Sequence, residues 1–241
     1  MTRMLASVAN VREAEIALAA GVDIIDIKDP SRGVLGAVAP TVARAIVRHV
    51  AGRCPTSATI GDCPMQGGPL GKAIDDMAAT GVDIVKVGVF AGAVSLEALD
   101  VVCCRTRAGT AIVVVYFAEL AAWPVDFAAL ARAGVTGVML DTAEKTGGSL
   151  RSILKEETLM QFIRGARRAG LPAGLAGSLQ VADIAPLLRL QPDTLGFRGA
   201  LCRGRQRKQA IDGRAVRRVR AMIPLAPVPV TLRPPINISA M

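Results

Sequence analysis

The stretch Ala19-Ala20-Gly21-Val22-Asp23-Ile24-Ile25-Asp26 carries the pattern that decides the fold. The residues before it have the apolar spacing of a helix, Gly21 is suited to end that helix, and the isoleucines that follow are typical of a buried strand. Similar phrases occur at residues 79–86 and 132–139, with weaker copies at 168–171 and 191–196. This internal repeat predicts a chain of alternating helices and strands.

Eight segments have the composition of short buried strands, at residues 4–8, 23–28, 56–60, 83–88, 111–116, 137–141, 173–176 and 194–198. Eight segments of helical periodicity alternate with them, at residues 11–20, 41–50, 70–80, 95–108, 125–133, 155–169, 181–190 and 212–222. This alternation predicts a (β/α)₈ barrel over residues 1–223, with an open, doubly wound sheet as the alternative. The Pro-rich residues 224–241 are expected to form an extended tail.

Composition and cysteine usage narrow the class of protein. The 241 residues are 51% hydrophobic, yet no apolar run reaches the roughly 20 residues of a membrane helix. Arg12, Glu13 and Glu15 interrupt any signal peptide, so we expect a soluble, cytoplasmic protein without membrane partners. The five cysteines form no C-x-x-C pair and the single histidine is His49, which argues against a zinc site or a Ser-His-Asp triad.

The net charge of +9 suggests an anionic partner. Arginine supplies most of it, because the chain has few lysines, at positions 28, 72, 86, 145, 155 and 208. Lysines at strand ends therefore need an explanation other than solubility. A nucleic-acid-binding module is the alternative from a different class, using the basic residues Arg203, Arg205, Arg207, Lys208, Arg214, Arg217, Arg218 and Arg220. We disfavour it, because aromatic residues, on which bases could stack, are only 3% of the chain.

Charged residues recur where the predicted strands end. In a (β/α)₈ barrel the functional residues lie at these ends. The positions concerned are Asp26 and Lys28 after the second strand, Asp62 after the third, Lys86 after the fourth, Glu119 after the fifth, and Asp141 and Lys145 after the sixth. A salt-bridged strand end would explain any one of them, but not their recurrence.

Alignment of the repeats places Lys86 on Asp26 and Asp141 on Lys28, so these four positions share one strand parity. We therefore expect their side chains to point into the barrel mouth, while Ile25 and its neighbours of opposite parity face the helices. A buried lysine amine can condense with a carbonyl to form an imine, which requires a lowered pKa. A second ammonium nearby would lower it, and the aspartates could transfer protons.

Two glycine-containing loops predict a phosphate site. Gly177-Ser178 follows the seventh strand, and Arg198-Gly199-Ala200 follows the eighth. Glycine lets backbone N–H groups approach an anion, and these two loops form the usual phosphate site of such barrels. Together they favour a small phosphorylated substrate.

These motifs resemble the (5-formylfuran-3-yl)methyl phosphate synthase family. The resemblance runs from about residue 5 to residue 222 and includes residues 24–30 with 33–37, 57–62, 86–88, 139–143 with Lys145, 175–178 and 198–200. It departs at residues 116–119, Tyr-Phe-Ala-Glu, where the family tends to have a Tyr-Ala-Asp run, so no role is assigned to Glu119.

The resemblance implies an enzyme resembling a class I aldolase that joins two molecules of glyceraldehyde 3-phosphate, with loss of phosphate and water, to make the furan precursor of methanofuran. It assigns the Schiff base to Lys28 and other catalytic roles to Asp26, Lys86, Asp141 and Lys145. It implies no metal and no organic cofactor, and a setting in one-carbon metabolism. Another Schiff-base aldolase or a phosphosugar isomerase is the enzymatic alternative. We also expect a homo-oligomer, which the many small apolar residues would permit.

Overall fold

The computed structural model describes residues 1–90, 92–121, 123–144 and 147–224. Across these residues, parallel strands form a closed barrel in the order β1 to β8. The strands are β1 (Arg3–Val8), β2 (Ile24–Ile27), β3 (Thr56–Thr59), β4 (Ile84–Val89), β5 (Ile112–Phe117), β6 (Gly137–Asp141), β7 (Ala173–Leu175) and β8 (Thr194–Phe197). The predicted (β/α)₈ fold is confirmed, and the open sheet is excluded because β1 pairs with β8.

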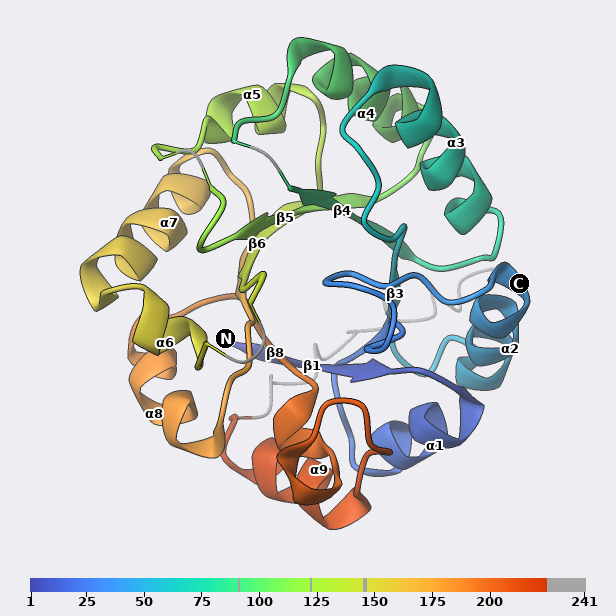
Figure 1. Cartoon of the computed structure of the whole chain (residues 1–241), viewed down its shortest axis with the longest axis vertical. Helices are drawn as coiled ribbons and strands as arrows, with labels where there is room; N and C mark the ends of the chain where they lie inside the picture. Colours follow the sequence, from blue (N-terminus) through green and yellow to red (C-terminus); the bar gives the residue numbers. More distant parts are fainter. Residues whose placement is uncertain (91, 122, 145–146, 225–241) are drawn as a thin grey trace, which may run out of the picture.

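Helices surround this ring on all sides, as Figure 1 shows in a view into the barrel. They are α1 (Val11–Ala19), α2 (Pro40–Val50), α3 (Gly67–Ala78), α4 (Leu96–Arg107), α5 (Phe127–Arg132), α6 (Leu150–Ile153), α7 (Glu156–Arg168), α8 (Val181–Arg189) and α9 (Gly213–Ala221), with short 3₁₀ turns η1 (Gly199–Leu201) and η2 (Arg203–Arg205). The sequence did not predict α6 or the two 3₁₀ turns. Within the described ranges no helix is long and apolar enough to cross a membrane.

The aspartate of the repeated sequence phrase has a structural role at the amino ends of the strands. The aspartate before an even-numbered strand accepts a hydrogen bond from the backbone N–H at the start of the preceding strand. The pairs are Met4 N to Asp23 Oδ2 at 2.6 Å, Thr56 N to Asp83 Oδ2 at 2.7 Å, and Ala173 N to Asp193 Oδ2 at 2.8 Å. Each bond satisfies an N–H at the barrel base and ties two neighbouring strands together.

The strands alternate between two hydrophobic environments. Ile25 and Ile27 point outward and pack in the large core between the strands and the helices. Ile24 points inward, into a smaller cluster with Leu5, Phe117 and Met139 among others. Asp26 follows Ile24 on the same inner face of β2, one layer nearer the carboxyl end of the strand.

Candidate active site

Asp26 is the centre of the charged cluster in the barrel. The register sets it beside Ser7 of β1 on one side and Ser57 of β3 on the other. Both hydroxyls donate to its carboxylate, Ser7 Oγ at 2.8 Å and Ser57 Oγ at 2.7 Å. The ammonium of Lys86 on β4 lies 2.8 Å from Oδ1. Asp26 is fully buried, and these contacts replace its lost hydration.

The charge state of Asp26 follows from two opposing effects. Burial raises its pKa, but the charges of Lys86 and Lys28 and the hydrogen bonds from Lys86 and Ser57 together outweigh that effect, so the pKa of Asp26 is lower than its ordinary value. Asp26 is therefore a carboxylate at neutral pH. It compensates the buried positive charge of Lys86.

Lys28 and Asp141 form the second pair. Lys28 follows β2, where its backbone N–H donates to Val8 O at 2.9 Å, and Asp141 is the last residue of β6. The Lys28 Nζ lies 3.7 Å from Asp141 Oδ2, and the two side chains are only 8% and 5% exposed. The other carboxylate oxygen of Asp141 accepts from Thr142 N at 2.7 Å. Asp141 is thus oriented by its own loop and reaches Lys28 across the barrel mouth.

These residues line one cavity of about 480 Å³ at the carboxyl ends of the strands. Asp26, Lys28, Lys86, Asp141, Gly177, Ser178, Arg198 and Gly199 are in its wall, together with Arg205, Gln206, Arg207 and Lys208. Four of the five predicted catalytic residues are therefore brought together, and the fifth, Lys145, lies outside the described residues. Ala200 is buried in η1 and is not part of the cavity wall.

The loop after β2 covers part of the barrel opening, where Figure 1 shows it reaching inward over the ring. The carboxylate of Asp62 accepts from Val34 N at 3.0 Å and Leu35 N at 2.8 Å, and Thr59 Oγ1 donates to Leu35 O at 2.6 Å. Leu35 is fully buried. A Cβ at Gly36 would lie 2.3 Å from backbone oxygens, so only glycine fits this turn. Asp62 thus fixes the conformation of this loop and is not part of the cavity wall.

The loop after β7 approaches the loop after β6 very closely. Gly177 has φ +105°, and a Cβ there would lie 2.8 Å from Thr142 N. Glycine is required at this position, because any side chain would displace the segment that orients Asp141. The chain then enters α8, whose first turn is closed by hydrogen bonds between Gln180 and Asp183.

Arg198 has a positional role in the structure. Its guanidinium forms a bidentate pair with Glu13 of α1, at 2.5 and 3.1 Å. It also donates to the carbonyl oxygens of Ser7, Arg207 and Gln209, at 3.1, 2.9 and 3.0 Å. These bonds occupy all five N–H donors of an arginine. With these donors used inside the protein, any contact of this loop with an anion would have to come from its backbone N–H groups.

Several residues of the site were missed by the sequence interpretation. Ser7 and Ser57 share the strand parity of Asp26, which was the available signal. Arg207 was grouped with surface arginines. Glu119, to which no role was assigned, accepts from Ala143 N at 2.8 Å and Glu144 N at 3.0 Å and so fixes the loop after β6.

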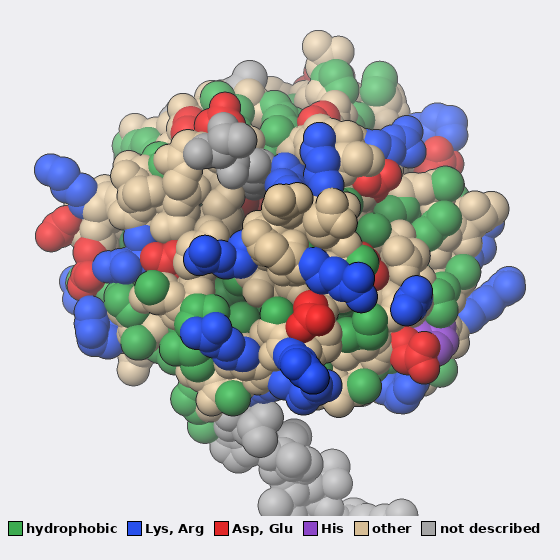
Figure 2. All heavy atoms as spheres, turned by 60° about the horizontal axis from the view of Figure 1, so that its bottom comes forward, with side chains coloured by type: hydrophobic (Ala, Val, Ile, Leu, Met, Phe, Trp, Pro, Cys, Tyr) green, Lys and Arg blue, Asp and Glu red, His purple; other side chains and the backbone are tan. Residues whose placement is uncertain are grey.

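The basic residues of the last third do not form one surface. Arg220 is buried and pairs with Asp23 at 2.7 Å, and Arg207 lines the cavity. In Figure 2 the Lys and Arg side chains are spread over the visible face, with hydrophobic, acidic and neutral groups between them. This distribution gives no support to a continuous nucleic-acid-binding face.

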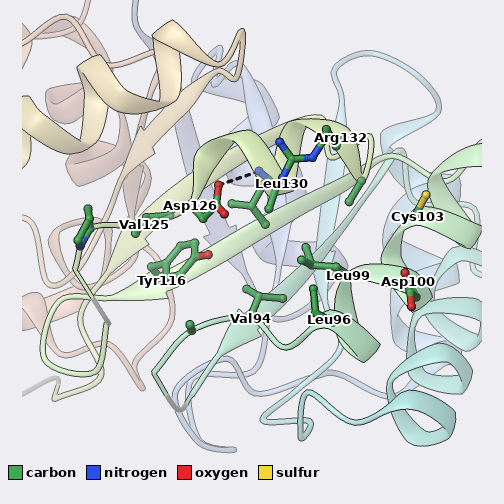
Figure 3. A pocket seen from close by; sticks show the side chains of 14 residues that line it. Val94, Leu96, Leu99, Asp100, Cys103, Tyr116, Val125, Asp126, Leu130 and Arg132 are labelled. Carbon is green, nitrogen blue, oxygen red and sulfur yellow. Dashed lines mark hydrogen bonds between the residues drawn. The ribbon is translucent and has the colours of Figure 1, made fainter.

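A second pocket lies outside the barrel, between α4 and α5. Tyr116 points outward from β5 into it, beside Leu99 and Leu130, as Figure 3 shows. Burial raises the pKa of Tyr116 above its ordinary value. Asp126, at the rim, is used as the cap of α5 and accepts from Ala129 N at 2.9 Å. The pocket holds none of the buried lysines, so it has no evident share in the chemistry of the cavity.

The described residues contain no group of three or more His, Cys, Asp and Glu side chains arranged to hold a metal ion. The functional groups of the cavity are instead amines, carboxylates and glycine loops at the carboxyl ends of parallel strands. Fold and site together are those of a (β/α)₈-barrel enzyme, with the charged groups at the end of the barrel where such enzymes carry their functional residues.

The chain belongs to the 4-HFC-P synthase family, whose model matches residues 4–220. It is 46% identical over 221 residues to a Methylorubrum extorquens protein provisionally named (5-formylfuran-3-yl)methyl phosphate synthase, with 91% of each chain covered. It is 36% identical over 229 residues to the Methanopyrus kandleri protein of that name, covering 90% of this chain and 97% of that one.

Solved structures support the fold. A 3-hexulose-6-phosphate synthase superposes with a TM-score of 0.64 at 19% identity, covering 92% of this chain and 100% of that chain. A phosphoribosyl anthranilate isomerase from Thermus thermophilus gives a TM-score of 0.65 at 14% identity, covering 92% and 98%. At such identities the likeness concerns the barrel alone.

Proposed function

We propose that this enzyme condenses two molecules of glyceraldehyde 3-phosphate to (5-formylfuran-3-yl)methyl phosphate, the furan precursor of methanofuran, through a Schiff base on Lys28. The named relatives support the product. The observation that carries the mechanism is the placement of Lys28 and Lys86 in one cavity, each facing a buried carboxylate. The atoms balance if one phosphate and two waters are lost.

In this mechanism Lys28 is the nucleophile, and its amine must be unprotonated to attack an aldehyde carbon. Asp141 lies closest to that amine among the described carboxylates and is placed to take up its proton. The attack forms a carbinolamine, which loses water to give the iminium. The iminium then withdraws electrons from the neighbouring carbon, so a proton there becomes acidic.

Lys86 and Asp26 have a different part in the proposal. Their 2.8 Å contact and the two serine hydroxyls hold Lys86 as an ammonium at a fixed position in the cavity wall. A fixed positive charge stabilises an oxyanion or enolate that develops beside it, with little reorganisation during the reaction. The family resemblance adds Lys145 as a further catalytic position.

The test of the Schiff base is reduction with borohydride in the presence of glyceraldehyde 3-phosphate. We expect a stable adduct whose mass maps to Lys28. Lys28→Arg should keep the fold and lose turnover by at least about 10³-fold, since a guanidinium forms no imine. The matched control is Lys72→Arg, because Lys72 is exposed and pairs with Asp76 on the surface; it should behave as the wild type.

Product analysis separates this proposal from another Schiff-base aldolase or an isomerase. A furan aldehyde absorbs in the near ultraviolet, whereas an aldol or isomerised sugar phosphate does not. Turnover without a furan product would refute the proposed reaction. An adduct at a lysine other than Lys28 would refute the assignment of the nucleophile.

A further inference from the structure

Arg207 carries an unsatisfied buried donor beside the cavity. Its Nη2 atom is inaccessible to solvent and has no hydrogen-bond partner among the residues that the structure describes. A buried donor without an acceptor is costly, and more so on a charged group. Arg198, nine residues earlier in the chain, differs from Arg207 in this respect, because oxygen atoms of the protein accept hydrogen bonds from all of its N–H donors.

The position of Arg207 is fixed by its backbone. Its carbonyl oxygen accepts from Arg198 Nε at 2.9 Å, and the neighbouring Gln209 O accepts from Arg198 Nη2 at 3.0 Å. The loop after β8 is thereby anchored to Glu13 and brings Arg207 into the cavity wall with Lys28 and Asp141. Burial lowers the pKa of Arg207, and the carboxylate of Asp141 acts against that shift. The guanidinium is thus held near the reacting groups.

We propose that Arg207 binds the phosphate group that is expelled during the condensation. This rests on the proposed function, in which two phosphorylated trioses occupy the cavity together. Two such substrates need two anion positions. The glycine loops after β7 and β8 account for one, and Arg207 offers the second: its planar guanidinium matches two phosphate oxygens at once.

The chemistry of the imine places the lost phosphate close to Lys28. Removal of the C2 proton from the iminium gives an enamine. The enamine electrons then form the C2=C3 double bond and restore the C1=N iminium. The C3–O bond breaks, and its electron pair leaves with the phosphate. C3 becomes electrophilic, and in the furan product this carbon carries the new C–C bond to the second triose. Arg207 would neutralise the charge that develops on the departing phosphate.

The test compares Arg207→Met and Arg207→Lys with Arg203→Met as the control. Arg203 is an exposed arginine of the same loop and is not in the cavity wall. With glyceraldehyde 3-phosphate, Arg207→Met should lower kcat/KM for phosphate release about 10- to 100-fold, the range expected for one charged hydrogen-bonded contact. Arg207→Lys should recover part of this loss, and Arg203→Met should show none.

Two further measurements separate ligand binding from a structural role. Calorimetric titration with inorganic phosphate should give two sites in the wild type and one in Arg207→Met. Borohydride trapping at Lys28 with unphosphorylated glyceraldehyde, which has no phosphate for Arg207 to bind, should be equal in both proteins.

Unchanged phosphate stoichiometry and unchanged kcat/KM in Arg207→Met would overturn the proposal. The proposal would also be overturned if Arg207→Met lost borohydride trapping with unphosphorylated glyceraldehyde as strongly as it lost kcat/KM with the phosphorylated substrate. Arg207 would then support the fold of the site rather than bind phosphate. Failure of the proposed function is distinguishable, since the wild type would then give neither the furan nor the adduct, whereas the phosphate titration does not depend on turnover.

Discussion

Replacement of Asp26 by asparagine tests whether the central ion pair contributes to stability. Asparagine has nearly the same volume, and its Oδ1 can accept from one of the two serine hydroxyls while its NH2 donates to the other, so packing is preserved. The negative charge is lost, and Lys86, which is 3% exposed, is left with its charge uncompensated. Breaking a buried ion pair by removing one partner costs about 3–5 kcal/mol. We expect Asp26→Asn to lower the free energy of unfolding by that amount.

The assay is urea denaturation at pH 7, followed by far-ultraviolet circular dichroism. With an m-value of about 2–3 kcal/mol per molar urea, the midpoint should fall by about 1–2 M. Asp76→Asn is the matched control, because Asp76 makes a contact of 2.6 Å with Lys72 but on the exposed surface of α3. An exposed pair of this kind contributes about 0.5 kcal/mol or less. Equal midpoints for Asp26→Asn and Asp76→Asn would refute the reasoning.

The double variant Asp26→Asn/Lys86→Met adds a second check on the same argument. If the loss arises from an uncompensated ammonium, removing that ammonium should recover most of it. A double variant as unstable as Asp26→Asn would show instead that the amide disturbs the packing around the serines.

The pH dependence of stability follows from the lowered pKa of Asp26. The unfolded chain has the ordinary value of 3.8 and the folded state a lower one. The unfolded state therefore binds the proton more readily, and the contribution of Asp26 is fully present above pH 3.8. It is lost as the pH falls from there through the folded pKa. Asp26→Asn should remove this part of the acid sensitivity, which denaturation curves at several pH values would measure.

Two further predictions concern the loops around the cavity. Gly177→Ala should lower kcat/KM for the phosphorylated substrate at least about tenfold, with little change in the circular dichroism spectrum. The reason is that the new Cβ would lie 2.8 Å from a backbone nitrogen of the loop after β6, at a residue whose φ is +105°. Wild-type kinetics would contradict this prediction. Arg198→Lys should lower the unfolding free energy by about 2–4 kcal/mol, since a lysine cannot reproduce the bidentate pair with Glu13 and three carbonyl contacts. Limited proteolysis should then cut the loop after β8 faster; an unchanged cleavage rate would count against the anchoring role.

The sequence was sufficient for the barrel because each unit repeats the same local physics. A glycine ends the helix, β-branched residues form the strand, and an aspartate or threonine stands between them. The strand period of two then placed Asp26, Lys28, Lys86 and Asp141 on the inner face, and the structure has all four in one cavity. Element ends differ from the predicted ones by at most three residues, as for α3, which begins at Gly67 rather than at residue 70.

What the sequence could not supply depends on register and on long-range contacts. Strand parity shows that Ser7 and Ser57 face inward, but only the pairing of β1 and β3 with β2 sets both beside Asp26. The place of Arg207 depends on Glu13 holding Arg198, a contact between residues 185 positions apart. In a chain whose last third is rich in arginine, the one half-buried guanidinium that lacks a partner for its Nη2 atom has no sequence signature.

The balance of charge in the cavity explains why it should take an anion. Among the described residues, the buried or half-buried basic side chains in its wall are those of Lys28, Lys86, Arg198 and Arg207, and the carboxylates are those of Asp26 and Asp141. Glu13 compensates Arg198, which leaves three basic groups for two carboxylates. One positive charge is therefore in excess. In a site with little water, such an excess raises the free energy of the empty enzyme. A phosphorylated ligand would relieve it, whereas a neutral sugar would not, so the same imbalance that lowers stability would favour the phosphorylated substrate that we propose.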